Sequence, residues 1–64
     1  MKLNGKHRTL EKKTTITNFL KKEGYNEERV AVEQNGIIIS KDKFKTEYIT
    51  DDDILEIVQF VGGG

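Results

Sequence analysis

Two Asn-Gly pairs constrain the fold of this chain more than any other feature of its sequence. Asn-Gly favours a two-residue type I′ turn, because both central residues of that turn need a positive φ angle. The first pair, Asn4-Gly5, predicts a β-hairpin over roughly residues 1–10. The second pair, Asn35-Gly36, lies between the β-branched runs 29–34 and 37–40 and predicts a second hairpin there.

The length of each turn also predicts the register of its hairpin. Two-residue turns place Leu3 opposite Lys6 in the first hairpin and Val32 opposite Ile39 in the second. The side chains of Val30, Val32 and Ile39 then lie on the face toward the core. A turn longer by one residue would move these side chains to the opposite face.

A helix is predicted between the two hairpins. Thr14 or Thr15 can cap its N-terminus, and Gly24 supplies its C-terminal stop. Lys21 and Lys22 fall in its last turn, where positive charge suits the helix dipole. The apolar residues that follow the helical spacing i, i+3, i+4 are Ile16, Phe19 and Leu20. Two turns of helix are not stable alone in water, so this helix is expected to pack on the sheet.

Residues 54–61 are predicted to form the last strand. They follow a polar connector with one short helical turn near residues 41–44 and a turn at Asp51–Asp53. The apolar residues at odd positions of the strand are Leu55 and Ile57, and those at even positions are Ile54, Val58 and Phe60. Apolar side chains on both faces are typical of a central strand that a helix covers on one side. The apolar side chains on the other face would then form a second core layer or contact a partner.

The order hairpin, helix, hairpin, connector and strand predicts an α+β fold. In this fold one helix packs across a mixed sheet of four or five strands. The chain has 64 residues, which is enough for one small domain. We expect this domain over residues 1–61, followed by residues 62–64 as a flexible C-terminal glycine tail.

The composition excludes several classes of function. The 11 Lys and Arg residues balance the 11 Asp and Glu residues, which argues against nucleic acid or an anionic membrane as the main partner. There is no cysteine, so disulfides, thiolate metal sites and a cysteine nucleophile are excluded. No apolar run is long enough to span a bilayer, and the N-terminus has no signal-peptide core, so we expect a cytoplasmic protein.

No part of the predicted domain carries a catalytic constellation. His7 is the only histidine, and we expect an exposed strand residue without the orienting partner and pocket that a general base needs. The Asp51–Asp53 run lacks the alternating ligands of a calcium loop, and we interpret it as a solvated turn. The chain has no phosphate-loop motif for ATP. These observations favour a carrier or binding module over an enzyme.

Gly62, Gly63 and Gly64 directly follow the last strand. They are either a flexible terminus or cloning scar, or a functional tail. Because glycine has no Cβ, three extended glycines can thread a narrow channel and place the carboxylate of Gly64 about 10 Å beyond the strand. That carboxylate is ionised in the cell and becomes reactive only after activation, for example as an acyl-adenylate. A functional tail therefore implies an ATP-using partner.

Two segments carry a resemblance to a known family. They read VAVEQNG at residues 30–36 and EIVQFVGGG at residues 56–64. This combination resembles the sulfur carrier proteins of thiamine biosynthesis, and the similarity covers most of the chain. The chain departs from the family pattern at residues 11–15, where an acidic or glycine-containing turn is more usual, and at Ser40, where the family often has proline.

The resemblance implies a ubiquitin-like β-grasp fold and the function of a sulfur carrier. An E1-like enzyme would adenylate the carboxylate of Gly64 with ATP and magnesium, and the chain itself would bind no cofactor. Sulfur that a desulfurase delivers from cysteine would replace the adenylate and give a C-terminal thiocarboxylate. Thiazole synthase would take this sulfur to build the thiazole ring of thiamine. The residues implied to dock on these partners are Val58, Phe60 and Val61.

Two alternatives share the chemistry of the tail. The small subunit of molybdopterin synthase would donate sulfur to the molybdenum cofactor, but that family is typically longer and matches residues 30–36 less well. A ubiquitin-like protein modifier would be joined to lysines of other proteins through Gly64.

Overall fold

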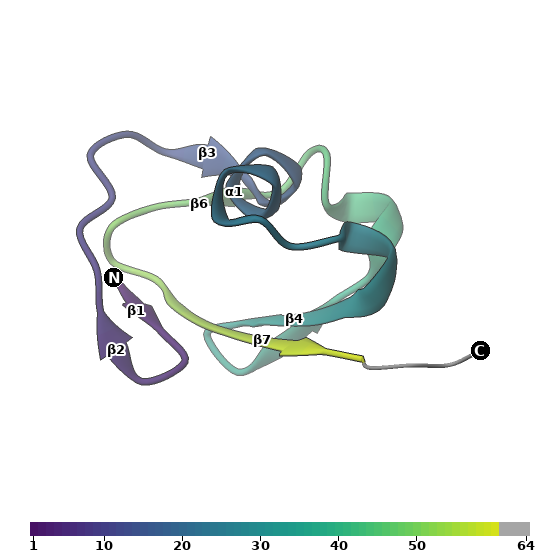
Figure 1. Cartoon of the computed structure of the whole chain (residues 1–64). Coiled ribbons are helices and arrows are strands. Elements are labelled where there is room, and N and C mark those ends of the chain that lie inside the picture. The colour runs from purple at the N-terminus through teal and green to yellow at the C-terminus, as the bar shows by residue number, and fades with distance from the viewer. Residues whose placement is uncertain (61–64) are drawn as a thin grey trace.

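The computed structural model describes residues 1–60 and arranges them in two layers (Figure 1). The helix α1 (Ile16–Glu23) lies across one face of a five-stranded sheet. The strands of this sheet, in spatial order, are β2 (Lys6–His7), β1 (Lys2–Leu3), β7 (Ile54–Gln59), β4 (Val30–Gln34) and β5 (Ile37–Ile39). Only β1 and β7 run parallel, so the sheet is mixed. The predicted α+β arrangement is therefore confirmed, with five strands.

Both predicted hairpins are present with the predicted registers. Leu3 pairs with Lys6, and Val32 pairs with Ile39. The turns depend on positive φ angles at Asn4 (51°) and Asn35 (54°), each followed by a glycine in the same region of φ. Asparagine and glycine adopt this conformation at the lowest cost, which is why the two Asn-Gly pairs identified the turns correctly.

The helix begins and ends where the sequence predicts. Thr15 is the N-cap, and its Oγ1 accepts a hydrogen bond from the backbone N–H of Asn18 at 3.2 Å. Gly24 ends the helix with a left-handed φ of 84°, a conformation that places its N–H against the last helical carbonyls. Ile16, Phe19 and Leu20 are buried against the sheet.

The connector between β5 and β7 contains structure that the sequence analysis did not foresee. The short helix η2 (Lys41–Lys43) fits the turn expected near residues 41–44, and a similar turn, η1 (Glu27–Arg29), precedes β4. In addition, β3 (Thr14–Thr15) pairs with β6 (Tyr48–Ile49) in a second, two-stranded sheet. Strands of two residues are too short to show hydrophobic alternation, so no sequence pattern predicts them.

The core lies between α1 and the inner face of the large sheet. Leu55 and Ile57 of β7 contribute to it from the middle of that sheet. Phe44 and Ile49 of the connector are fully buried and close the core beside the helix. The remaining core residues, from both hairpins and α1, are Met1, Leu3, Ile16, Phe19, Leu20, Val30 and Val32. None of the helices within residues 1–60 combines the length and apolarity needed to span a bilayer.

The Asp51–Asp53 turn is present, but the interpretation of its carboxylates as merely solvated is wrong. Asp51 Oδ1 accepts hydrogen bonds from the Leu10 backbone N–H at 2.8 Å and from the Met1 ammonium at 3.1 Å. These two bonds, the first above all, lower the pKa of Asp51 below its ordinary value of 3.8. The carboxylate therefore ties the first hairpin to the start of β7.

Asp53 is the other hydrogen-bonded carboxylate of the turn, and partial burial alone would raise its pKa. Hydrogen bonds from the Asn35 side chain, the Thr50 backbone and the Gln34 side chain outweigh that effect and leave the pKa below 3.8. The Asp53 carboxylate therefore connects the second hairpin to the same end of β7.

We expect Asp51→Asn to lower the melting temperature at neutral pH. The folded-state pKa of Asp51 is depressed, so its stabilisation is present above the unfolded-state pKa and is lost as pH falls through the folded-state value. The difference in melting temperature between Asp51→Asn and the parent should thus shrink below pH 3.8. Thermal unfolding followed by circular dichroism across this range measures it. Asp52→Asn, next in the chain and without such bonds, should melt like the parent at every pH.

Candidate functional site

The strand β7 positions the candidate site. It lies at the centre of the sheet, between the parallel strand β1 and the antiparallel strand β4 (Figure 1). Phe60 directly follows β7, and its backbone N–H donates a hydrogen bond to the Arg29 carbonyl at 2.7 Å. The predicted site residues Val61, Gly62, Gly63 and Gly64 follow Phe60 and lie outside the described residues.

The asparagines of both hairpin turns bind the backbone of β7. Asn4 extends the ladder beyond the end of β1, because its Oδ1 accepts from the Ile57 N–H at 2.8 Å and its Nδ2 donates to the Ile57 carbonyl at 3.3 Å. On the opposite edge, Asn35 Oδ1 accepts from the Ile54 N–H at 2.9 Å, and the Asn35 N–H donates to the Ile54 carbonyl at 2.8 Å. The two turns thus anchor both edges of the strand that precedes the tail.

Sequence reasoning missed this second role of the asparagines. It used Asn-Gly only as a signal for positive φ, for which aspartate or glycine would serve as well. Of these three residues, only asparagine carries both a donor and an acceptor that can imitate a peptide group. The occurrence of asparagine, and not aspartate or glycine, in both turns was therefore the sequence signal for this second role.

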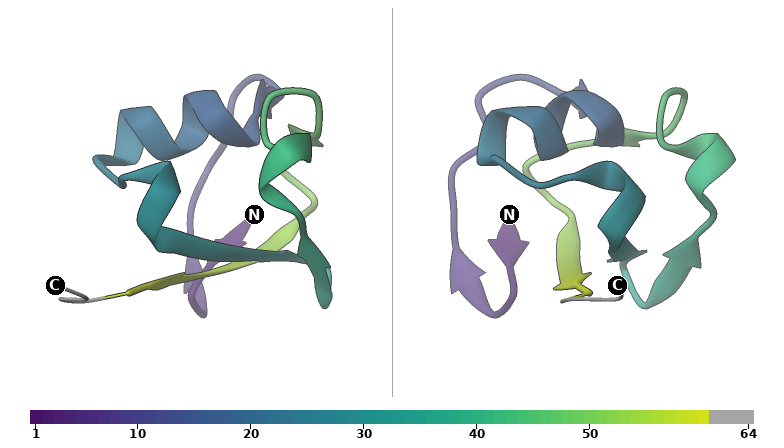
Figure 2. Two further views of the ribbon diagram at one scale, coloured as in Figure 1. Left: turned by 90° about the vertical axis from the view of Figure 1, so that its right-hand side faces the viewer. Right: turned by 45° about the vertical axis from the view of Figure 1, so that its right-hand side comes forward.

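The two faces of β7 have different environments. Leu55 and Ile57 are buried under α1, whereas Ile54, Val58 and Phe60 are 52%, 58% and 56% exposed. The exposed side chains belong to the face opposite α1, against which no other helix or strand of residues 1–60 lies (Figure 2). The structure thus exposes Val58 and Phe60 instead of burying them in a second core layer. Their role in docking stays a prediction.

The exposed face, which we call the outer face, is not uniformly apolar. Ile38 of β5 is 74% exposed and adds to its apolar area. Glu33 and Glu56 pair directly across β4 and β7 and lie on the same face. The outer face is thus an apolar surface with acidic side chains at its centre, next to the residues that lead into the glycine tail.

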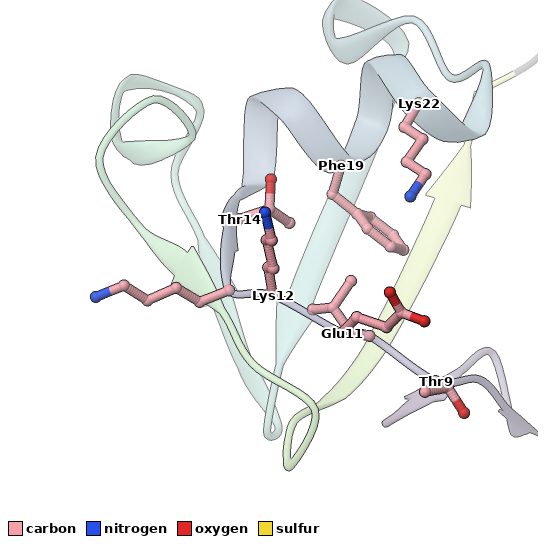
Figure 3. Close-up of a pocket in the computed structure, with 8 residues that line it drawn as sticks. Thr9, Glu11, Lys12, Thr14, Phe19 and Lys22 are labelled. Atoms are coloured by element: carbon pink, nitrogen blue, oxygen red, sulfur yellow. The ribbon is translucent and has the colours of Figure 1, made fainter.

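A hollow of about 540 Å³ opens on the other side of the molecule, between residues 9–14 and α1 (Figure 3). Phe19 reaches into it from the helix, and Glu11, Lys12 and Lys22 are among the residues that line it. These charged side chains make no hydrogen bond with one another, so the hollow contains no coupled acid and base.

His7 does not contribute to that hollow. It is exposed on the edge strand β2, as the sequence predicts. Residues 1–60 also contain no group of three His, Asp or Glu side chains able to hold a metal ion. The outer face is therefore the candidate site that remains among residues 1–60.

Comparison with known proteins identifies consistent relatives. The model of the ThiS family matches residues 1–64. The sulfur carrier protein ThiS of Bacillus subtilis is 40% identical over 65 residues, which cover 100% of this chain and 98% of that protein. A thiazole synthase of Magnetococcus marinus is 37% identical over 62 residues, which cover 97% of this chain but 19% of that protein. The chain thus spans about a fifth of the length of that relative.

A solved structure supports the same comparison. The crystal structure of the thiamine biosynthesis protein ThiS from Geobacter metallireducens matches with a TM-score of 0.83 and 30% sequence identity. The match covers 98% of this chain and 96% of that chain. The similarity therefore extends over the whole fold and not only over the segments near the C-terminus.

We expect substitutions on the two faces of β7 to have opposite consequences for stability. Leu55→Ala should lower the free energy of unfolding by about 2–5 kcal/mol, because Leu55 is fully buried and its truncation leaves a cavity. Val58→Ala, three residues along the same strand, should change it by less than about 0.5 kcal/mol, because the side chain is exposed. Urea unfolding of both variants measures the difference. Equal losses would contradict the assignment of the faces.

We expect Asn4→Gly to weaken the anchoring of β7. Glycine keeps the positive φ of the turn but removes both side-chain bonds to Ile57, which should cost about 1–2 kcal/mol. Hydrogen exchange followed by NMR gives a local readout, since the Ile57 amide should exchange faster. The amide of Glu56, which faces β4, serves as the internal control. Unchanged protection of the Ile57 amide would contradict the role of Asn4.

Proposed function

The chain belongs to the ThiS family of sulfur carrier proteins of thiamine biosynthesis, and we propose that it carries sulfur as a thiocarboxylate on Gly64. The observation that carries this proposal is the family match over residues 1–64, which includes Gly62, Gly63 and Gly64. The fold is the ubiquitin-like β-grasp. The family match favours thiamine biosynthesis over the transfer of sulfur to the molybdenum cofactor.

The proposed chemistry takes place on partner enzymes. An ionised carboxylate is a poor electrophile, so an E1-like enzyme first activates Gly64. One carboxylate oxygen of Gly64 attacks the α-phosphorus of ATP, pyrophosphate leaves with its magnesium ion, and an acyl-adenylate forms. A protein persulfide, which a desulfurase forms from cysteine, then attacks the acyl carbon, and AMP leaves with the bonding electron pair. A second thiol attacks the resulting acyl disulfide and forms a disulfide with the sulfur donor, and the C-terminal thiocarboxylate leaves with the electron pair of the broken S–S bond.

Within this scheme the chain acts as a protein co-substrate and not as a catalyst. The hollow beside α1 contains no coupled acid and base, and the tail needs only to be reached by the active site of another protein. Glycine suits such a tail, because the absence of a Cβ allows close approach of surrounding side chains. Asn4 and Asn35 hold β7, from whose end the sequence continues into the tail, in place within the sheet.

Thiazole synthase is the proposed acceptor of the sulfur. The relative from Magnetococcus marinus supports this partnership, because a segment similar to this chain is part of a protein named thiazole synthase. The nucleophilic sulfur stays bound to a protein until transfer, which avoids release of sulfide. We propose that the reactions take place in the cytoplasm, where ATP is available.

Mass spectrometry of the intact chain tests the proposal. After incubation with a purified activating enzyme, ATP, magnesium and a sulfur source, one oxygen at Gly64 should be replaced by sulfur. A parallel reaction with the Bacillus subtilis ThiS protein serves as the control that the activating enzyme is competent. An unchanged mass under these conditions would contradict the proposed function.

Deletion of Gly64 provides the matched control. We expect this variant to keep the melting temperature of the parent, because the core lies within residues 1–57. It should form no thiocarboxylate, because the acceptor carboxylate is displaced by one residue. Thiocarboxylate formation on the shortened chain would show that Gly64 is not the required end of the tail.

A further inference from the structure

We propose that Glu33 and Glu56 form a receptor for one basic side chain of the activating enzyme, at the centre of the outer face. The proposal rests on the proposed function, because it concerns the partner that adenylates Gly64. It adds a specific electrostatic contact to the apolar docking surface around Val58 and Phe60.

The sheet register brings the two carboxylates together. Glu33 and Glu56 are directly paired residues of β4 and β7. Directly opposite residues of an antiparallel pair point their side chains to the same face, with Cβ atoms about 4.5–5.5 Å apart. Ala31 and Val58 form the neighbouring pair on that face, and Ile38 lies across from Glu33 on β5. Apolar residues therefore flank the acidic pair along β7 and across it on β5, whereas Lys2 lies on the same face at the β1 side.

The repulsion between these carboxylates is not relieved within the described chain. Neither the Glu33 carboxylate nor the Glu56 carboxylate forms a hydrogen bond or an ion pair with any of residues 1–60. Lys2 pairs with Ile54, diagonally from Glu56, and yet makes no ion pair with it. Like charges directly opposite one another destabilise a sheet. A local rule that is broken without internal compensation is expected at functional positions.

Exposed apolar side chains beside a charged centre have the composition of a protein interface. Ile38, Ile54 and Val58 expose more than half of their surface around the acidic pair. On docking, such side chains exclude water and strengthen a charge pair at the centre. An arginine suits the receptor best, because its planar guanidinium can bind both carboxylates through separate N–H groups. A lysine would bind them as a single point charge.

The charge of the acidic pair distinguishes between the possible binding partners of the outer face. A second copy of this chain, packed face to face, would bring four carboxylates together, and nucleic acid would be repelled. A metal ion would find two carboxylates but no third ligand among residues 1–60. A basic partner protein is complementary. We assign it to the activating enzyme, because Phe60 of the outer face is four residues from Gly64 in the sequence, and adenylation is the first reaction of Gly64.

The double variant Glu33→Gln/Glu56→Gln tests the receptor. It keeps the size and the hydrogen-bonding capacity of both side chains and removes only the charges. Binding to the activating enzyme, measured by titration calorimetry, should weaken by about tenfold or more. The melting temperature of the double variant should equal or exceed that of the parent, because the repulsion is removed. Loss of affinity together with retained stability distinguishes a docking role from a structural role.

The control is the double variant Glu11→Gln/Asp42→Asn, which removes the same charge from exposed positions away from the outer face. It should bind the activating enzyme with the affinity of the parent. Equal affinities of the two double variants would overturn the proposal. So would a loss of affinity for thiazole synthase alone, or a dimer of the parent chain, seen by sedimentation, that dissociates in Glu33→Gln/Glu56→Gln.

The outcome can be separated from that of the proposed function. If the parent chain forms the thiocarboxylate while Glu33→Gln/Glu56→Gln binds the activating enzyme like the parent, only the receptor is refuted. If the parent chain forms no thiocarboxylate with a competent enzyme, the proposed function itself fails.

Discussion

The insertion of β7 between β1 and β4 is the interaction on which the rest of this structure depends. It joins the first and the last strand of residues 1–60, since β1 begins at residue 2 and β7 ends at residue 59. A parallel and an antiparallel neighbour hold the strand, but β1 pairs with only Ile54 and Leu55. The Asn4 amide supplies the missing peptide group opposite Ile57 and so extends this short edge. Without it, the strand that leads to the tail would be paired on one edge only beyond Leu55.

Much of the fold could be predicted because its signals are local. Positive φ at Asn-Gly, the Thr15 cap and the Gly24 stop each depend on a few neighbouring residues, and the structure has all of them where the sequence placed them. The pairing of β3 with β6 and the bonds of Asp51 join residues more than thirty positions apart. Such contacts follow from the tertiary arrangement and leave no periodicity in the sequence, so they could not be predicted.

The candidate site, like the fold, could be predicted from the sequence only in part. The alternation along β7 predicted which side chains are buried, and it left open whether Val58 and Phe60 belong to a second core layer. The structure answers that question by exposing them. The acidic pair was beyond sequence reasoning for a different reason. Glu33 and Glu56 are 23 positions apart, and their meeting depends on the register between β4 and β7, which neither hairpin turn determines.

The distribution of stabilising interactions also distinguishes the two faces of the sheet. Arg8 and Glu23 form two hydrogen bonds, at 2.9 and 2.7 Å, that join the first hairpin to the end of α1 and lower the pKa of Glu23. Asp51 likewise satisfies two donors in the first hairpin. The outer face has no equivalent, since the carboxylates of Glu33 and Glu56 have no partner within residues 1–60.

A domain of 64 residues buries little apolar surface and has a small margin of stability. It would gain from an apolar or oppositely charged residue at either position of the acidic pair. The presence of both carboxylates on the face that no other element of residues 1–60 covers, one on β7 and one on its neighbour β4, is therefore better explained by a requirement of binding than by a requirement of folding.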